Sequence, residues 1–179
     1  MEREIMVGTV TARFRATAAV PRLYRIKFKR DILRDMAALQ KAYVHDEDGD
    51  RVDVDKLDLE AIENIAYIMA KHADPQGVPA DPDEWLAQFE GFSLYRAAGE
   101  IISLWTDNMQ GSVSPKKTLR ATARETSDAL FLLRCVQLGL QISELELLTV
   151  GMVFDMISES ANDDEDWPEL ATQEDFDEF

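Results

Sequence analysis

The chain has few cysteines, few histidines and few basic residues for its size. Its 179 residues include one Cys, two His, and 19 Lys and Arg against 35 Asp and Glu, which gives a formal net charge of −16. A single Cys cannot form an internal disulfide, and this is typical of a reducing compartment. So acidic a chain is a poor candidate for binding nucleic acid or anionic lipid, because phosphate binding requires Lys and Arg to displace counterions.

Long apolar runs are also missing. The opening MEREIMVGTV lacks the apolar core of a signal peptide, and no stretch reaches the roughly 18 apolar residues of a membrane-spanning helix. The apolar share of 46% is ordinary for a folded chain and supplies enough material for a core. We therefore expect a cytoplasmic protein without membrane contact, made of one compact domain or of one domain with a small satellite.

Motifs for catalysis or metal binding are not found. Counted from Asp46, the acidic turn has glycine at the fourth position instead of the sixth, and Leu57 stands where an EF-hand needs its last glutamate. Two His and one Cys do not make a zinc site. Cys135 lies in an apolar stretch that favours a buried side chain over a nucleophile. We predict that the protein is not an enzyme and uses no cofactor or metal.

The acidic residues are concentrated at the C-terminus. Residues 1–117 contain 16 basic and 20 acidic residues, whereas residues 118–179 contain 3 basic and 15 acidic. The segment 161–179 has no basic residue, and its self-repulsion predicts a disordered acidic tail. Its aromatic residues, Trp167 among them, leave open a second interpretation, in which the tail is a short motif that orders in a partner's pocket.

Alternating residues near the N-terminus predict a β-hairpin. Apolar positions recur with period two in Thr9–Ala16 and again in Tyr24–Phe28, around a turn near Pro21. Because an isolated hairpin is only marginally stable, its apolar face should rest on helices. Its basic residues either form a solvated face or dock an acidic segment of another subunit or partner, with Arg25 and Lys27 as the candidate contacts.

The rest of the chain has the apolar spacing of helices. Helices are predicted to begin near Ile32, Asp58, Asp81, Ser93, Ser127, Ser143 and Thr149. A Gly, Ser and Pro-containing stretch after residue 109 indicates a linker. The predicted fold is therefore mainly α with an N-terminal β-hairpin (α+β). It has a module at 1–110, a linker at 111–126, a small helical module at 127–160 and an acidic tail at 161–179.

The small helical module has more apolar side chains than it can bury alone. Three short helices in about 35 residues form too small a core. Either they dock on the first module or their apolar faces meet another protein. The candidate partner-binding residues are Leu130, Phe131, Leu138, Leu147, Phe154 and Ile157, with Trp167 from the tail.

Two phrases carry a resemblance to a known family. PRLYRIKFKRDI and GLQISELELLTVGMVFDMI, joined through a Ser, Pro and Lys linker, resemble the tail assembly chaperones of long-tailed, siphovirus-type bacteriophages. The resemblance is to the long form, which is made by fusing two reading frames, and it covers roughly residues 9–160. Lys116–Lys117 at the module boundary is compatible with a run of adenines on which a ribosome slips.

The resemblance implies a function and two partners. The first module would keep the tape-measure protein soluble, and the added module would recruit tail-tube subunits during tail assembly in the host cytoplasm. A homo-oligomer is compatible with this role, and no nucleic acid is involved. The main alternative is an acidic nucleic-acid mimic that inhibits a DNA-binding protein. The net charge favours a mimic, whereas clustering of the acid in a tail does not, because a mimic needs charge spaced on a rigid surface.

Overall fold

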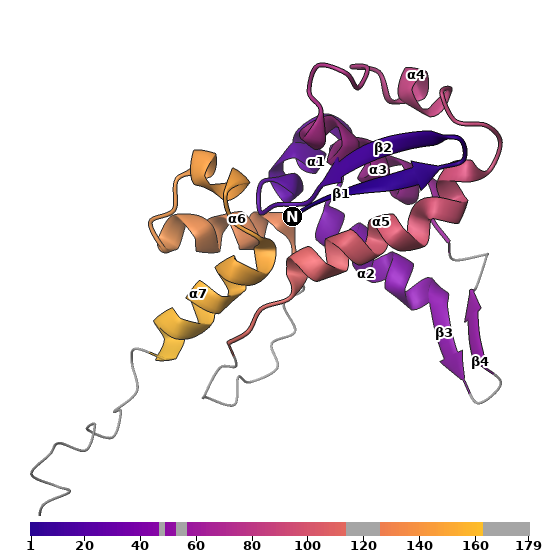
Figure 1. The fold of residues 1–179 in the computed structure, drawn as a ribbon. Helices are drawn as coiled ribbons and strands as arrows, with labels where there is room; N and C mark the ends of the chain where they lie inside the picture. Colours follow the sequence, from indigo (N-terminus) through magenta and orange to yellow (C-terminus); the bar gives the residue numbers. More distant parts are fainter. Residues whose placement is uncertain (47–48, 53–56, 114–125, 163–179) are drawn as a thin grey trace, which may run out of the picture.

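The structure is a computed structural model that describes residues 1–46, 49–52, 57–113 and 126–162, with the backbone alone for 43–46 and 49–52. The described residues form seven α-helices, two β-hairpins and a 3₁₀ helix (Figure 1). In chain order the elements are β1 (Glu2–Val7), β2 (Val10–Arg15), α1 (Val20–Phe28), α2 (Ile32–Ala42), β3 (Tyr43–Asp46), β4 (Gly49–Val52), α3 (Leu59–Ala73), α4 (Pro82–Leu86), α5 (Ser93–Met109), α6 (Asp128–Gln137), η2 (Ile142–Glu146) and α7 (Val150–Asn162).

The N-terminal hairpin pairs β1 with β2 in antiparallel register. Val7 faces Val10 across a two-residue turn, and Gly8 in this turn adopts φ +66°, a conformation that glycine tolerates best. Ile5, Val7 and Phe14 point inward and are buried, whereas Met6 is exposed. The hairpin lies across α3 and α5, so its apolar face is covered by helices as expected (Figure 1).

The predicted N-terminal hairpin is confirmed, but the strand predicted for Tyr24–Phe28 is wrong. The second strand is the preceding segment β1, and residues 20–28 form α1. Pro21 fits the first turn of a helix, where its missing N–H is not needed. Tyr24 and Phe28 are four residues apart and so share a helical face, and Ile26, which a strand would have buried with them, is 53% exposed.

The central helices begin at the predicted caps. The Asp58 carboxylate accepts a hydrogen bond from the Ala61 N–H at 3.0 Å, and that of Asp81 accepts one from the Asp83 N–H at 3.0 Å. The acidic turn after α2 is in fact the hairpin of β3 and β4. Among the described residues, no helix is both long and apolar enough to cross a bilayer.

A chain of aromatic side chains ties the first elements together. Phe14 of β2 meets Trp85 edge to face, Trp85 meets Tyr67 of α3, and Tyr67 meets Phe28 of α1, with ring centroids 5.8–6.4 Å apart. Such pairs each contribute about 0.5–1.5 kcal/mol beyond the area they bury. The hairpin, α1, α3 and α4 therefore share one core.

The C-terminal helices rest on this core. Ser127 caps α6 through the Leu130 N–H at 3.3 Å, and Thr149 caps α7 through the Met152 N–H at 3.0 Å, as predicted. The short helix predicted to begin at Ser143 is the 3₁₀ helix η2, which is capped by Gln141 and Glu144 instead. Its inward side chains belong to the same buried cluster as the rest of the molecule: Phe131, Cys135, Leu145, Val150 and Val153.

Of the two alternatives left open by the sequence, the structure shows docking of this module on the first. Residues 114–125 of the predicted linker, including Lys116–Lys117, and residues 163–179 of the predicted tail lie outside the described residues. We call residues 1–113 the N-terminal body and residues 126–162 the C-terminal unit.

Candidate partner-binding surface

The C-terminal unit packs against the body with one face and exposes apolar side chains on the other. Figure 1 shows α6 and α7 beside α1 and the end of α5. Leu147 is 81% exposed and Val136 is 60% exposed. We define the outer apolar residues as the six large apolar side chains of this unit that are exposed: Leu133, Val136, Ile142, Leu147, Met152 and Met156.

The residues predicted to bind a partner are distributed over both faces. Leu147 is exposed, as a contact residue requires, and Leu130, Leu138 and Ile157 are half-buried. Phe131 is 2% exposed and stacks edge-on against the half-buried Phe154 at 5.9 Å, so these two rings face the body. Trp167 lies outside the described residues.

Sequence reasoning missed most of the outer apolar residues. Leu133 and Val136 are three positions apart in α6, and they fall opposite Phe131 and Cys135, which are buried. A helical wheel of α6 would have separated these two stripes. It could not have said which stripe faces the body, because both are apolar.

A groove separates the C-terminal ends of α6 and α7. It has a volume of about 430 Å³, and Leu138 and Ile157 supply its apolar lining. Arg134 stands at its edge and donates a hydrogen bond to Gln137 at 2.7 Å. Two of the predicted contact residues therefore share one concave site.

Two carboxyl groups join α6 to the body. The Asp128 N–H donates to the Asp31 carboxylate at 2.9 Å, and the Leu33 N–H donates to the Asp128 carboxylate at 3.4 Å. The Asp31 carboxylate also accepts from the Arg34 N–H at 3.3 Å. Each carboxylate therefore caps the first turn of the opposing helix, where orphan N–H groups and the helix dipole favour negative charge.

The pKa values of Asp128 and Asp31 are shifted in opposite directions. Asp128 is fully buried, and this burial together with its hydrogen bond to Asp31 raises the pKa of Asp128 to about 7. Burial opposes ionisation of Asp31 too, but hydrogen bonds from Asp128 hold the pKa of Asp31 below its ordinary value. Arg25 bridges the two, with its guanidinium 3.0 Å from Asp31 and 3.5 Å from Asp128.

A second polar joint fixes α7 to the end of α5. The Asp155 carboxylate accepts hydrogen bonds from the Ser112 and Val113 N–H groups, each at 2.8 Å, and these bonds lower the pKa of Asp155. The backbone at Gly151 passes so close to Gln110 that a Cβ atom at Gly151 would overlap the Gln110 carbonyl. Between η2 and α7, the Ala18 N–H donates to the Leu148 carbonyl at 2.8 Å.

The basic residues near the N-terminus engage the protein itself. Arg25 belongs to the carboxyl joint described above. Lys27 donates to the Ala80 carbonyl at 2.8 Å and lies 5.6 Å from the centre of the Tyr67 ring. Arg13 is 3.7 Å from Asp74, and Arg30 pairs with Asp35 at 2.8 Å. Arg13, Arg25 and Arg30 of the predicted basic docking face thus form ion pairs within the protein, whereas Lys27 bonds to a backbone carbonyl.

The described residues hold no group of three or more His, Cys, Asp or Glu side chains arranged to bind a metal ion. Cys135 is buried, as predicted, and this burial raises the pKa of its thiol. His72 at the end of α3 shares a hydrogen bond of 2.9 Å with the Thr17 hydroxyl, and burial lowers the pKa of its imidazole.

No protein-family model matches this chain, and no curated protein or solved structure matches it either.

Proposed function

We propose that the protein is a tail assembly chaperone of a long-tailed bacteriophage, in the form fused by ribosomal frameshifting. In this role the N-terminal body keeps the tape-measure protein soluble, and the C-terminal unit recruits tail-tube subunits. The proposal rests on the resemblance of PRLYRIKFKRDI and GLQISELELLTVGMVFDMI to that family. Its main structural support is the C-terminal unit, which leaves six large apolar side chains exposed.

The physical chemistry of the surface suits a chaperone. Burying a large apolar side chain contributes roughly 1.5–3 kcal/mol, so the outer apolar residues favour contact with an apolar partner. Contiguous exposed apolar surface often marks a binding site, and the outer apolar residues are the candidates for such a surface in this chain. The formal net charge of −16 keeps a chain with such a surface soluble before its partner arrives.

The first test uses the gene neighbourhood, and the second uses the purified proteins. A gene between those of the tube and the tape-measure proteins, with a change of frame near Lys116–Lys117, is expected. The tube protein of that phage, kept unpolymerised, should bind the full chain but not the fragment 1–117. The tape-measure protein, diluted from denaturant, should scatter less light when either the full chain or the fragment 1–117 is present.

A pair of variants makes the binding test specific. V136D/L147D should weaken binding of the tube protein, because it places charge among the outer apolar residues. M6D/I26D changes two exposed apolar residues of the body and should bind as wild type. Equal binding of the tube protein by the fragment 1–117 and by the full chain would contradict the proposed division of roles.

The net charge of −16 also supports the second candidate, an acidic mimic of nucleic acid. Deleting residues 161–179 removes nine acidic residues and no basic ones. A mimic built on that segment should lose its inhibition of DNA binding, whereas a chaperone lacking it should still hold the tape-measure protein in solution.

A further inference from the structure

The outer edge of β2 has backbone groups without partners. Met1 and Ala16 exchange both of their backbone hydrogen bonds, at 2.8 and 2.9 Å. Because such pairs alternate along an antiparallel ladder, Ala12 and Phe14 bond to β1, whereas the N–H and C=O groups of Thr11 and Arg13 point the other way. Within the described part of the chain, no hydrogen bond reaches these outward groups.

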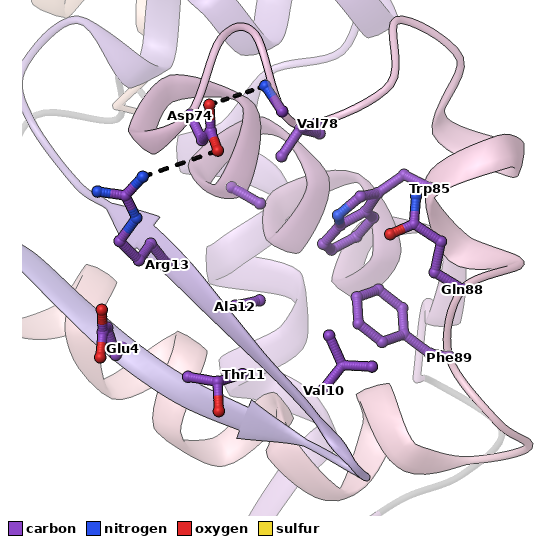
Figure 2. A pocket seen from close by; sticks show the side chains of 12 residues that line it. Glu4, Val10, Thr11, Ala12, Arg13, Asp74, Val78, Trp85, Gln88 and Phe89 are labelled. Atoms are coloured by element: carbon purple, nitrogen blue, oxygen red, sulfur yellow. Dashed lines mark hydrogen bonds and ion pairs between the residues drawn. The ribbon is translucent and has the colours of Figure 1, made fainter.

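A groove of about 350 Å³ runs along this edge. Four consecutive residues of β2, Val10–Arg13, line it. Side chains alternate between the two faces of a strand, so four neighbours can line one groove only along the strand's edge. Figure 2 shows these residues on one side of the groove, Trp85, Gln88 and Phe89 across from them, and Asp74 at one end beside Arg13.

Aromatic side chains form one wall of the groove, and polar side chains, among them Glu4, Arg13 and Asp74, line the rest of it. Trp85 is 3% exposed and is held edge-on by Phe14, Tyr67 and Phe89. A side chain entering from above would therefore meet aromatic surface, while a backbone beside it would meet the free groups of β2. This combination of a strand edge and an apolar pocket is what strand addition uses: main-chain bonds give affinity, and alternate side chains give specificity.

We propose that this groove binds an extended segment of another protein, which adds to β2 as a third strand. Its apolar side chains, at every second position, would lie on Trp85 and Phe89. This inference does not depend on the proposed function, because it rests on the body alone.

Charge and shape distinguish this occupant from two others. Arg13 is paired with Asp74, so within the described part of the chain the Glu4 carboxylate is the charged group lining the groove that has no ion pair. This favours a neutral or basic segment over the chain's own tail 161–179, where nine residues are acidic and none basic. A second copy pairing edge to edge would have to fit its own hairpin beside Gly77, Val78, Trp85, Gln88 and Phe89, which line the groove across from β2.

The probe for the test is an acetylated and amidated octapeptide of alternating valine and lysine. Binding to the full chain at physiological salt would be measured by isothermal titration calorimetry. Two N-methylated versions of the peptide serve as controls. One is methylated at every valine amide and the other at every lysine amide. Both keep the side chains and the charge of the parent peptide, but each lacks the N–H donors along one edge of the extended peptide. Saturable binding of the parent peptide is expected. Only one of the two methylated peptides should lose it, by about tenfold or more.

A matched pair of protein variants locates the site. T11P removes the Thr11 N–H, which faces the groove. Met6 is the cross-strand partner of Thr11, and M6P removes the Met6 N–H, which points outward from the opposite edge of the hairpin. T11P should weaken binding by about tenfold, while M6P should not. Amide exchange measured by NMR on the wild-type chain gives the same information without a substitution, since the Thr11 and Arg13 amides should become protected when the peptide binds.

The outcomes are decisive in either direction. Absence of binding at millimolar peptide, equal loss with both methylated peptides, or protection of amides on β1 instead of β2 would each overturn the proposal. Self-association of the wild-type chain that T11P abolishes would replace it with pairing between copies. Tighter peptide binding by a chain ending at residue 162 would replace it with occupation by the tail.

Discussion

The N-terminal body and the C-terminal unit bury their apolar side chains to different extents. Among the described residues, each exposes six large apolar side chains, although the C-terminal unit is about a third of the size of the body. The largest fully buried side chains, Trp105, Tyr24, Tyr67 and Phe14, all belong to the body. The body is thus stabilised by its own core, whereas the C-terminal unit is stabilised by docking on that core and leaves its other face open.

The contacts that dock the C-terminal unit add a second difference. Aromatic contacts connect the elements within the body, whereas the unit is held by its buried apolar side chains together with hydrogen bonds at Asp128, Asp155 and Leu148. Hydrogen bonds weaken steeply when their geometry changes, and a carboxyl group also changes its charge with pH. The docking of the unit should therefore respond to single substitutions and to pH more sharply than the body does.

The largest expected effect contrasts two leucines of the C-terminal unit. Leu145 is 1% exposed and Leu147 is 81% exposed, two residues further along the chain. Leu145→Ala should lower the free energy of unfolding by about 2–5 kcal/mol, because it leaves a cavity in the shared core. Leu147→Ala should change it by less than about 0.5 kcal/mol. Urea denaturation measures both, and equal effects would mean that the unit does not dock as described.

The next effect concerns the close approach of α7 to the end of α5. Gly151→Ala places a methyl group against the Gln110 backbone, which cannot rotate away as a side chain could. We expect the free energy of unfolding to fall by about 1–3 kcal/mol, with faster amide exchange confined to α6 and α7.

Gly99→Ala in α5 is the matched control, because nothing lies within 4 Å of its Cβ position. The control should be more stable than wild type by about 0.5–1 kcal/mol. Loss of stability in both variants would indicate a general helix effect.

The third effect is a pH dependence at the carboxyl joint. Because the pKa of Asp128 is raised to about 7 in the folded chain, the folded chain keeps a proton that the unfolded chain releases near pH 4. Stability should therefore fall as pH rises from about 4 to 7, and this fall should level off above pH 7. Asp31, whose pKa is lowered, acts in the opposite direction at more acidic pH, where stability is lost as the pH falls.

Asp128→Asn tests this, because asparagine is neutral at every pH and can still accept from the Leu33 N–H. The difference in unfolding free energy between the variant and wild type should change by on the order of 1–3 kcal/mol between pH 5 and pH 8. Glu159→Gln, an exposed change in α7, should run parallel to wild type. A variant curve parallel to that of wild type would mean that Asp128 ionises freely.

Local signals predicted most of the elements. The caps at Asp58, Asp81, Ser127 and Thr149 are correct because capping depends on residues within one turn. The strand predicted at Tyr24–Phe28 is wrong because Tyr24 and Phe28, four positions apart, fit both a strand and a helix, so only the apolar Ile26 between them favoured the strand. Gly8 was the informative signal there, since it marks a two-residue turn between Val7 and Val10.

Contacts between distant segments could not be predicted in the same way. The pairing of Asp31 with Asp128 joins residues 97 positions apart, and nothing in either local sequence selects the other. The same is true of Arg25, which was proposed as a partner contact but bridges that pair. The sequence shows that the C-terminal unit has an excess of apolar residues. Which apolar stripe of α6 faces the body and which faces outward depends on how α6 docks, and the local sequence does not determine this.

Replacing two of the outer apolar residues should change stability least but should clearly reduce the binding of an apolar dye to the surface. Leu133 and Val136 are 46% and 60% exposed on α6, so replacing both with serine removes few native contacts. The free energy of unfolding should change by no more than about 0.5 kcal/mol per site. Binding of a dye such as bis-ANS should fall measurably, because the dye reports accessible apolar surface.

The same change at Met6 and Ile26 of the body, which are 70% and 53% exposed, provides the control. If dye binding depends on the outer apolar residues, the control should retain it. If both double variants lose dye equally, apolar exposure is a general property of the chain and does not distinguish the C-terminal unit.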